Sequence, residues 1–240
     1  MKRFYERTGV EPAEDGWHIL LDGRPMRTPA KMGLLVPTRV LAEAIAKEWG
    51  EVPEKADINV THLPLTRLAA TGIDRVANQR ARVIEDTAKY AQSDLLCYRA
   101  TDPATLVKRQ RDTWQPLLDW AAGRYGARLV VGSGTSFVTQ PADAVAALRA
   151  AVAAHSDMAL SALYNLTHIA GSIVIALAVA ERHLSAGQAF EAAQLDELYQ
   201  IERWGEDPIA TQRLNGIRKD IDAAARFLAL LEDTRLGGEG

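Results

Sequence analysis

The sequence contains a single cysteine, Cys97, among its 240 residues, so a disulfide framework is excluded and a reducing compartment is favoured. It also has no excess of basic residues. The formal net charge is −3, and this argues against a general nucleic-acid-binding protein, which needs positive charge to neutralise phosphates. The first ten residues are charged and contain no apolar signal core. We therefore expect a protein of a reducing compartment that has no nucleic acid as a partner and no targeting segment.

One long stretch has no charged residue. Residues 158–180 contain no Asp, Glu, Lys or Arg, and a run of this length is enough to span a bilayer. The run nevertheless carries Asn165, Thr167 and His168, and its flanks lack the aromatic and basic anchors of a membrane span. A helix in the middle of a bundle is apolar on all sides as well. We therefore expect a buried central helix and no insertion into a membrane.

Enzyme signatures are mostly absent. There is no phosphate-loop motif and no dinucleotide-binding glycine motif after a strand. The Gly- and Ser-rich residues 132–136 favour a hairpin turn over an anion site, because no helix follows at once. The five histidines show no metal-binding pair on one helix turn, and His168 is expected to be a hydrogen-bonded core residue. Cys97 lies in an apolar run, which favours a small buried side chain over a reactive thiol. The sequence indicates no catalytic residue, no metal and no cofactor.

Short strands are predicted near the N-terminus. Residues 17–21 lead into Asp22-Gly23, a two-residue pair that is a strong hairpin signal. Residues 24–28 are the expected returning strand. Residues 33–37 are a further short strand, and residues 3–8 are the expected partner of this small sheet.

The first helix is predicted to begin after Thr38, a favourable N-cap residue, and to stop at Gly50. A polar loop follows it, and we place a domain boundary there. The predicted domains are residues 1–55, a small β-rich domain with one helix, and residues 56–240, a helical bundle domain with a short hairpin near residues 129–138. The predicted fold class is therefore α+β, with a small N-terminal β-domain followed by a larger, mainly α-helical C-terminal domain.

Helical periodicity and capping signals predict most of the second domain. The expected helices cover residues 63–76, 80–92, 103–125, 141–155, 158–183, 185–205 and 208–231. Pro116 is expected to kink or interrupt the third of these helices. Gly171-Ser172 is a plausible bend in the fifth. The tail at residues 237–240 is expected to be mobile.

The helix expected over residues 185–205 carries two acids on apolar faces. Ser185 and Gln188 have the spacing of a capping box at its start. On a helical wheel of about 100° per residue, both Glu197 and Glu202 fall among apolar side chains. These neighbours are Phe190, Ala193, Ile201 and Trp204 for Glu197, and Leu195 and Leu198 for Glu202.

Two interpretations of these acids remain open, because a carboxylate is costly to bury unpaired. Either each acid meets a basic partner inside the fold, or the face is left uncovered by this chain and serves as a docking surface for another protein. Trp49 and Trp204 each lie in the last turn of an expected helix. A large ring at such a position either caps a core or anchors a partner.

Several segments together resemble a known family. They are Ala44–Trp49, Asp94–Arg99, Gln110–Trp120 and Leu195–Gly205. In this order they are similar to the ATP synthase assembly chaperones that attend the alpha subunit of the catalytic head, over about residues 2 to 235. The resemblance implies a non-enzymatic role, in which the protein binds the unassembled alpha subunit until the beta subunit replaces it. It implies no cofactor and no small-molecule substrate.

The resemblance also implies which residues bind the partner. By motif position, the acidic helix and the tryptophan of the first helix place this role on Glu197, Glu202 and Trp49. Trp204 and Gln200 of the acidic helix complete the expected set. Mitochondrial members carry a targeting extension, whereas the domain here begins near the first residues, so the chain looks like a bacterial, cytoplasmic member.

The alternative function is a small-molecule enzyme. Glu197 or Glu202 would act as a general acid or base, helped by His168, through a carboxylate pKa that is raised in a dry pocket. A closed pocket that joins Glu197 to a histidine would favour the enzyme. An open groove or a flat face would favour the chaperone.

Overall fold

The computed structural model describes residues 2–134 and 137–232 of the chain. The chain divides into two compact units. The first consists of Met1–Arg80, Ser156–Ala162 and Arg226–Gly240, and the second of Ala81–His155 and Leu163–Ala225. This division differs from the expected boundary at residue 55, because the first unit extends to Arg80 and includes two later segments of the chain. The α+β fold class is confirmed.

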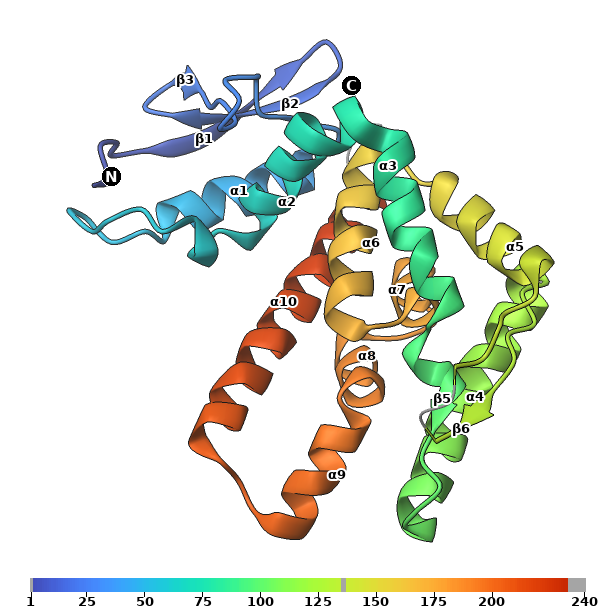
Figure 1. Ribbon diagram of the computed structural model, residues 1–240. Helices are drawn as coiled ribbons and strands as arrows, with labels where there is room; N and C mark the ends of the chain where they lie inside the picture. Colours follow the sequence, from blue (N-terminus) through green and yellow to red (C-terminus); the bar gives the residue numbers. More distant parts are fainter. Residues whose placement is uncertain (1, 135–136, 233–240) are drawn as a thin grey trace. The chain divides into compact units, whose positions relative to one another are not determined.

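The first unit contains a small antiparallel sheet (Figure 1). Its strands are β1 (Thr8–Ala13), β2 (Gly16–Leu21), β3 (Arg24–Pro25) and β4 (Leu35–Val36). Strand β2 pairs with β1 along one edge and with β3 and β4 along the other. The hairpin at Asp22-Gly23 is confirmed by the pairing of Leu21 with Arg24. The predicted partner at residues 3–8 is wrong, since β2 pairs instead with residues 8–13.

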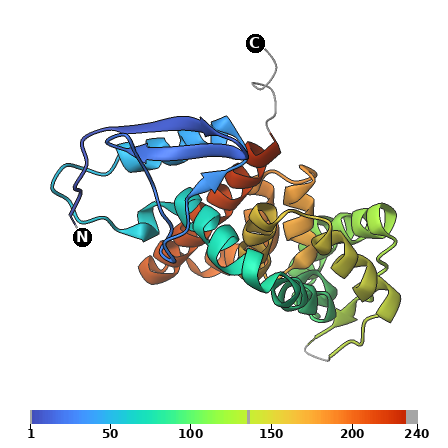
Figure 2. The same ribbon diagram turned by 90° about the horizontal axis from the view of Figure 1, so that it is seen from above.

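Helix α1 (Arg39–Gly50) packs against β1 and β2, beneath the sheet in Figure 1 and behind it in Figure 2. Its predicted cap is confirmed, since the Thr38 hydroxyl oxygen accepts a hydrogen bond from the backbone N–H of Leu41 at 3.3 Å. Leu41 and Ile45 are fully buried on the face towards the sheet. Burial of a side chain of this size stabilises a fold by roughly 1.5–3 kcal/mol.

Helix α2 (Pro64–Thr71), a π-helical turn (Gly72–Val76) and helix α3 (Ala77–Ala88) follow in sequence. Gly72 lies at a close approach to the start of α6, where an added Cβ would be 2.9 Å from the Met158 Sδ atom. A larger residue would push the two segments apart. The Ser161 hydroxyl donates to the carbonyl oxygen of Leu68 at 2.9 Å and holds the same contact.

Short 3₁₀ helices lie at Val60–His62, Lys89–Gln92 and Leu95–Cys97, and seven further α-helices complete the described chain. They are α4 (Ala104–Tyr125), α5 (Ala142–Ala153), α6 (Asp157–Ala170), α7 (Ile173–Ala180), α8 (Ala186–Ala193), α9 (Leu195–Trp204) and α10 (Pro208–Glu232). Helix α4 continues through Pro116 without interruption. Pro116 is exposed. The expected break there is therefore absent.

The uncharged run forms two helices, α6 and α7, where one bent helix was expected. The chain turns at Gly171, whose φ of 64° favours glycine, and Ser172 caps α7. All of α7 is buried. The carboxylate of Asp94 accepts hydrogen bonds from the Ser172 hydroxyl at 2.9 Å and the Val174 N–H at 3.2 Å. Burial raises the pKa of Asp94 from 3.8 to about 6. Within residues 2–134 and 137–232, no helix has the length and apolar character needed to cross a membrane.

The region of the expected hairpin near residues 129–138 is arranged differently where it is described. Strand β6 (Gly132–Ser133) pairs in parallel with strand β5 (Tyr98–Arg99). Residues 129–131 and 137–138 are not assigned to strands. Thr135 and Ser136 lie outside the described residues, as does the tail at residues 237–240.

Candidate docking surface

The segment expected to form one helix over residues 185–205 is divided into α8 and α9. The break lies at Gln194, whose φ of −110° and ψ of 19° are not helical. The capping box of Ser185 and Gln188 is confirmed at the start of α8. Because of the break, the single wheel across this segment is wrong. Phe190 is buried while Trp204 is exposed, although the wheel places them on one face.

Glu202 lies on the surface of α9 and pairs with an arginine of α4. The Arg109 guanidinium donates to both carboxylate oxygens of Glu202, at 2.8 and 2.7 Å. The Glu202 side chain remains 57% exposed. The hydrogen bonds and positive charge of Arg109 lower the pKa of Glu202 below its ordinary value. Glu202 is therefore charged, accepts a hydrogen bond at each carboxylate oxygen and remains accessible to solvent.

Glu197 has the equivalent arrangement towards the last helix. Its carboxylate lies 2.9 Å from the Arg213 guanidinium of α10, and its side chain is 34% exposed. The structure therefore has a feature of each of the two interpretations of these acids. Each acid has a basic partner within this chain, yet neither acid is shut away from solvent.

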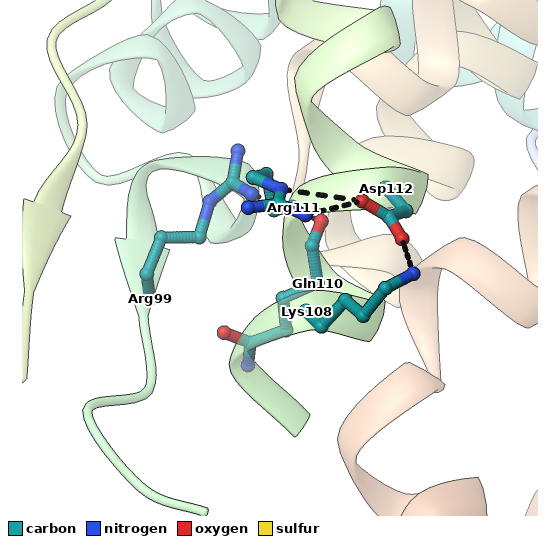
Figure 3. Close-up of polar contacts among 5 residues, drawn as sticks. All are labelled: Arg99, Lys108, Gln110, Arg111 and Asp112. Carbon is teal, nitrogen blue, oxygen red and sulfur yellow. Dashed lines mark hydrogen bonds and ion pairs between the residues drawn. The ribbon is translucent and has the colours of Figure 1, made fainter. Parts of the chain in front are cut away.

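The inner face of α9 is held by polar contacts to α4. The Tyr199 and Thr105 hydroxyls lie 2.5 Å apart. The Gln110 side-chain amide donates to Asp196 at 2.7 Å. Figure 3 shows Arg99 reaching from β5 towards α4, where its guanidinium donates to the Gln110 carbonyl oxygen at 2.9 Å. The first two contacts join α9 to α4, and the third joins α4 to β5.

The neighbouring turn of α4 is charged on its surface. Figure 3 shows Asp112 between Lys108 and Arg111. The Asp112 carboxylate lies 2.5 Å from the Lys108 ammonium and 3.2 Å from the Arg111 guanidinium. Hydrogen bonds from these two groups lower the pKa of Asp112. The surface of α4 at this turn therefore carries paired charges of both signs.

Two large apolar side chains flank the turn between α9 and α10. Trp204, at the end of α9, and Ile209, at the start of α10, are each 78% exposed. Gln200 of α9 is exposed as well. We call Glu197, Gln200, Glu202, Trp204 and Ile209 the α9 face. Its exposed tryptophan is of a residue type enriched at protein interfaces, and its carboxylates suit the polar rim that surrounds an interface core.

Trp49 belongs to the first unit and has a different environment. It is 7% exposed, and its indole N–H donates to the Thr66 hydroxyl at 3.0 Å. Its ring centroid lies 5.7 Å from that of Tyr5. Trp49 therefore packs in the core of the first unit, and a role in partner binding would act through that packing.

The sequence-based placement of His168 is wrong. His168 is exposed, and its ring lies tilted against two half-buried tyrosines, with centroid distances of 4.4 Å to Tyr164 and 5.1 Å to Tyr90. Cys97, by contrast, is buried as expected. Burial raises the pKa of its thiol to about 12, so the thiol stays protonated. Among the residues that the structure describes, no group of three or more His, Cys, Asp or Glu is arranged to hold a metal ion.

The sequence did not predict the arginines that pair with Glu202 and Glu197. Arg109 and Arg213 lie on α4 and α10, and Arg109 is 93 residues from its partner Glu202 in sequence. The only signal in the sequence was indirect, since an acid among apolar residues needs a counter-charge. Ile209 was missed as well, because an isoleucine at the start of an amphipathic helix looks like a core residue.

Comparison with known proteins identifies the family. Residues 2–122 match the family model of the ATP12 chaperone protein. This chain belongs to the ATP12 chaperone family. The resemblance to the ATP synthase assembly chaperones is thereby confirmed.

Solved structures and a curated relative agree with membership in the ATP12 family. The crystal structure of Atp12 from Paracoccus denitrificans is 39% identical, covers 96% of this chain and 98% of that chain, and superposes with a TM-score of 0.89. The Atu1473 protein from Agrobacterium tumefaciens is 41% identical, with 96% and 86% coverage and a TM-score of 0.90. The mitochondrial protein atp12 from Schizosaccharomyces pombe is 23% identical over 220 residues, covering 85% of this chain and 74% of that protein.

Proposed function

We propose that this ATP synthase assembly chaperone binds the unassembled alpha subunit of the catalytic head through its α9 face, and that it shields the surface meant for the beta subunit. The site of action is the bacterial cytoplasm, which fits the single cysteine and the two bacterial relatives. The observation that carries the proposal is the exposed Trp204 at the end of α9, a helix that also carries the solvent-accessible carboxylates of Glu197 and Glu202.

An unassembled subunit exposes a large apolar patch intended for its neighbour, and such patches aggregate. A chaperone must cover the patch and still leave when the true partner arrives. Trp204 and Ile209 supply apolar area for this cover. Tryptophan is the side chain most enriched at the energetic centres of protein interfaces.

The ion pairs of the α9 face explain how binding remains reversible. An exposed pair such as Arg109–Glu202 contributes little to the stability of a fold, because solvent screens it. A basic group of the alpha subunit can therefore replace Arg109 or Arg213 as the partner of an acid at little cost. The charges give orientation and selectivity, and they limit association between copies of the chaperone.

The enzyme alternative gains no support from the geometry. A general acid near neutral pH needs a raised carboxylate pKa, whereas Arg109 lowers that of Glu202. His168 packs against tyrosines, and the acids pair with arginines. Membership in a chaperone family also implies a role in binding and not in catalysis.

Co-purification with separately expressed alpha and beta subunits tests the proposal. The tagged chaperone is expected to retain alpha and not beta, and added beta is expected to release the bound alpha. Retention of beta alone, or of neither subunit, would contradict the proposal.

A further inference from the structure

The two carboxylates of the α9 face are already paired with arginines of the same chain. Arg109 of α4 donates to both oxygens of Glu202, at 2.8 and 2.7 Å, and Arg213 of α10 lies 2.9 Å from Glu197. The four side chains are between 34% and 57% exposed. A partner protein therefore has access to both ion pairs from solvent.

Arg109 has a second contact that does not involve Glu202. Its guanidinium lies 5.2 Å from the centroid of the Tyr199 ring, a distance at which a cation is attracted to an aromatic face. Tyr199 is held in place, because it is 5% exposed and its hydroxyl lies 2.5 Å from that of Thr105. If Glu202 turns to another cation, Arg109 keeps its contact with this ring.

The geometry at Glu202 shows which group fits in place of Arg109. Two N–H groups of one guanidinium meet the two oxygens of one carboxylate, an arrangement that the compact ammonium of lysine does not reproduce. An arginine of a partner makes the same two hydrogen bonds. Because an exposed pair is weak, exchanging one arginine for the other changes the free energy little, and the remaining contacts of the partner decide whether it binds.

We infer that the α9 face is autoinhibited, and that Arg109 and Arg213 occupy the positions of arginines of the alpha subunit until that subunit binds. This inference rests on the proposed function and adds the chemistry of the partner, namely arginines that accompany an apolar patch. Autoinhibition gives selectivity, because a protein that is only basic exchanges one ion pair for another without gain. A partner that also covers Trp204, which is 78% exposed, gains apolar burial in addition.

The affinity of the full-length chaperone for purified alpha subunit, measured by biolayer interferometry, tests this autoinhibition. Arg109→Ala and Arg213→Ala each remove an internal competitor and should tighten binding about threefold, and the double variant about tenfold. Arg149→Ala is the matched control, since Arg149 is an exposed arginine of α5 that pairs with Glu85, and it should bind like the wild type. Unchanged or lowered affinity in either single variant would overturn the inference.

The salt dependence of binding gives a readout that a change in packing alone does not move. In the wild type, an internal ion pair is broken for each pair formed with the partner, whereas Arg109→Ala forms a pair without breaking one. The affinity of Arg109→Ala should therefore fall more steeply than that of the wild type when salt is raised from about 0.05 to 0.5 M. Equal salt dependence in the two proteins would also overturn the inference.

Two observations keep these tests separate from a folding defect. The Tyr199 ring retains Arg203, whose guanidinium lies 5.1 Å from the ring centroid, so the melting temperature of Arg109→Ala should match that of the wild type. Arg109→Lys keeps the charge but loses the two-point contact, and its affinity should lie between those of the wild type and Arg109→Ala. An affinity of Arg109→Lys outside this range would contradict the assigned competition.

The outcomes also separate the autoinhibition from the proposed function. If the wild type binds alpha and neither arginine variant binds it more tightly, only the autoinhibition fails. If neither the wild type nor any variant binds alpha, the proposed function fails, and the autoinhibition fails with it.

Discussion

Two helix ends with nearly the same sequence have opposite environments in this protein. Glu48-Trp49-Gly50 ends α1, and Arg203-Trp204 ends α9, with Gly205 as its C-cap. Trp49 is buried against Tyr5 and Thr66, whereas Trp204 is among the most exposed apolar side chains described. Local sequence thus specifies that a helix ends, but segments elsewhere in the chain decide whether the ring becomes core or surface.

The glutamates beside these tryptophans differ in the same way. Glu48 accepts hydrogen bonds from the backbone N–H groups of Leu65 at 2.7 Å and Thr66 at 3.0 Å, and burial raises its pKa. Glu202 pairs with Arg109 in solvent, and its pKa is lowered. The first carboxylate holds the start of α2 in place. The second belongs to an exposed ion pair of the kind that contributes little to the stability of a fold.

The largest effect on stability is expected at the buried tryptophan. Trp49→Ala removes a core ring and its hydrogen bond to Thr66, and should lower the free energy of unfolding by roughly 3–5 kcal/mol. Urea denaturation followed by circular dichroism measures this. A loss below about 1 kcal/mol would show that Trp49 is not a core residue.

A smaller loss is expected at the buried glutamate. Glu48→Ala leaves two N–H groups in the first turn of α2 without their acceptor, and should lower the free energy of unfolding by about 1–2 kcal/mol. Glu51→Ala is the matched control, since Glu51 is an exposed residue that pairs only with Lys47 among the contacts described. An equal loss in both variants would contradict the capping role.

The same two glutamates should give opposite pH dependences. The raised folded-state pKa of Glu48 means that its stabilising contribution is present at low pH and is lost as pH rises through that pKa. The lowered pKa of Glu202 means that its contribution is present above the unfolded-state pKa and is lost as pH falls.

Unfolding free energies of the wild type, Glu48→Gln and Glu202→Gln between about pH 3 and 7 measure both effects. The free energy of unfolding of the wild type minus that of Glu48→Gln should decrease as pH rises. The free energy of unfolding of the wild type minus that of Glu202→Gln should increase as pH rises. If both differences changed with pH in the same direction, the environments assigned to Glu48 and Glu202 would be contradicted.

The smallest effect on stability is expected at the exposed tryptophan. Trp204→Ala should change the free energy of unfolding by less than about 0.5 kcal/mol, because the exposed ring buries little apolar area in the fold. Its affinity for the alpha subunit should fall at least about tenfold, as expected for an interface tryptophan. If Trp204→Ala lowered the free energy of unfolding, or kept full affinity for the alpha subunit, the contrast between the two helix ends would be contradicted.

Local chemistry explains what could be predicted from the sequence. The hairpin at Asp22-Gly23 and the caps at Thr38 and Ser185 depend on neighbouring residues, and all three occur. The break at Gln194 could not be predicted in this way, because no glycine or proline marks it. It arises where α8 and α9 each pack separately.

The candidate surface could be predicted only in part. Its acids and its tryptophan stand out in the sequence, but the acids pair with Arg109 and Arg213, which come from distant helices. Trp49 and Trp204 look alike within their own helices. Only tertiary packing separates the residue that supports the fold from the one left open to a partner.

Binding of purified alpha subunit to three charge-reversal variants tests the α9 face most directly. Glu197→Lys and Glu202→Lys each place a lysine beside an arginine and should lower affinity by about a hundredfold. Glu85→Lys is the matched control, because Glu85 is also an exposed glutamate paired with an arginine, Arg149. The account predicts that all three variants keep the circular dichroism spectrum of the wild type and that only the first two lose alpha binding. Full affinity in Glu197→Lys and Glu202→Lys, or an equal loss in Glu85→Lys, would contradict it.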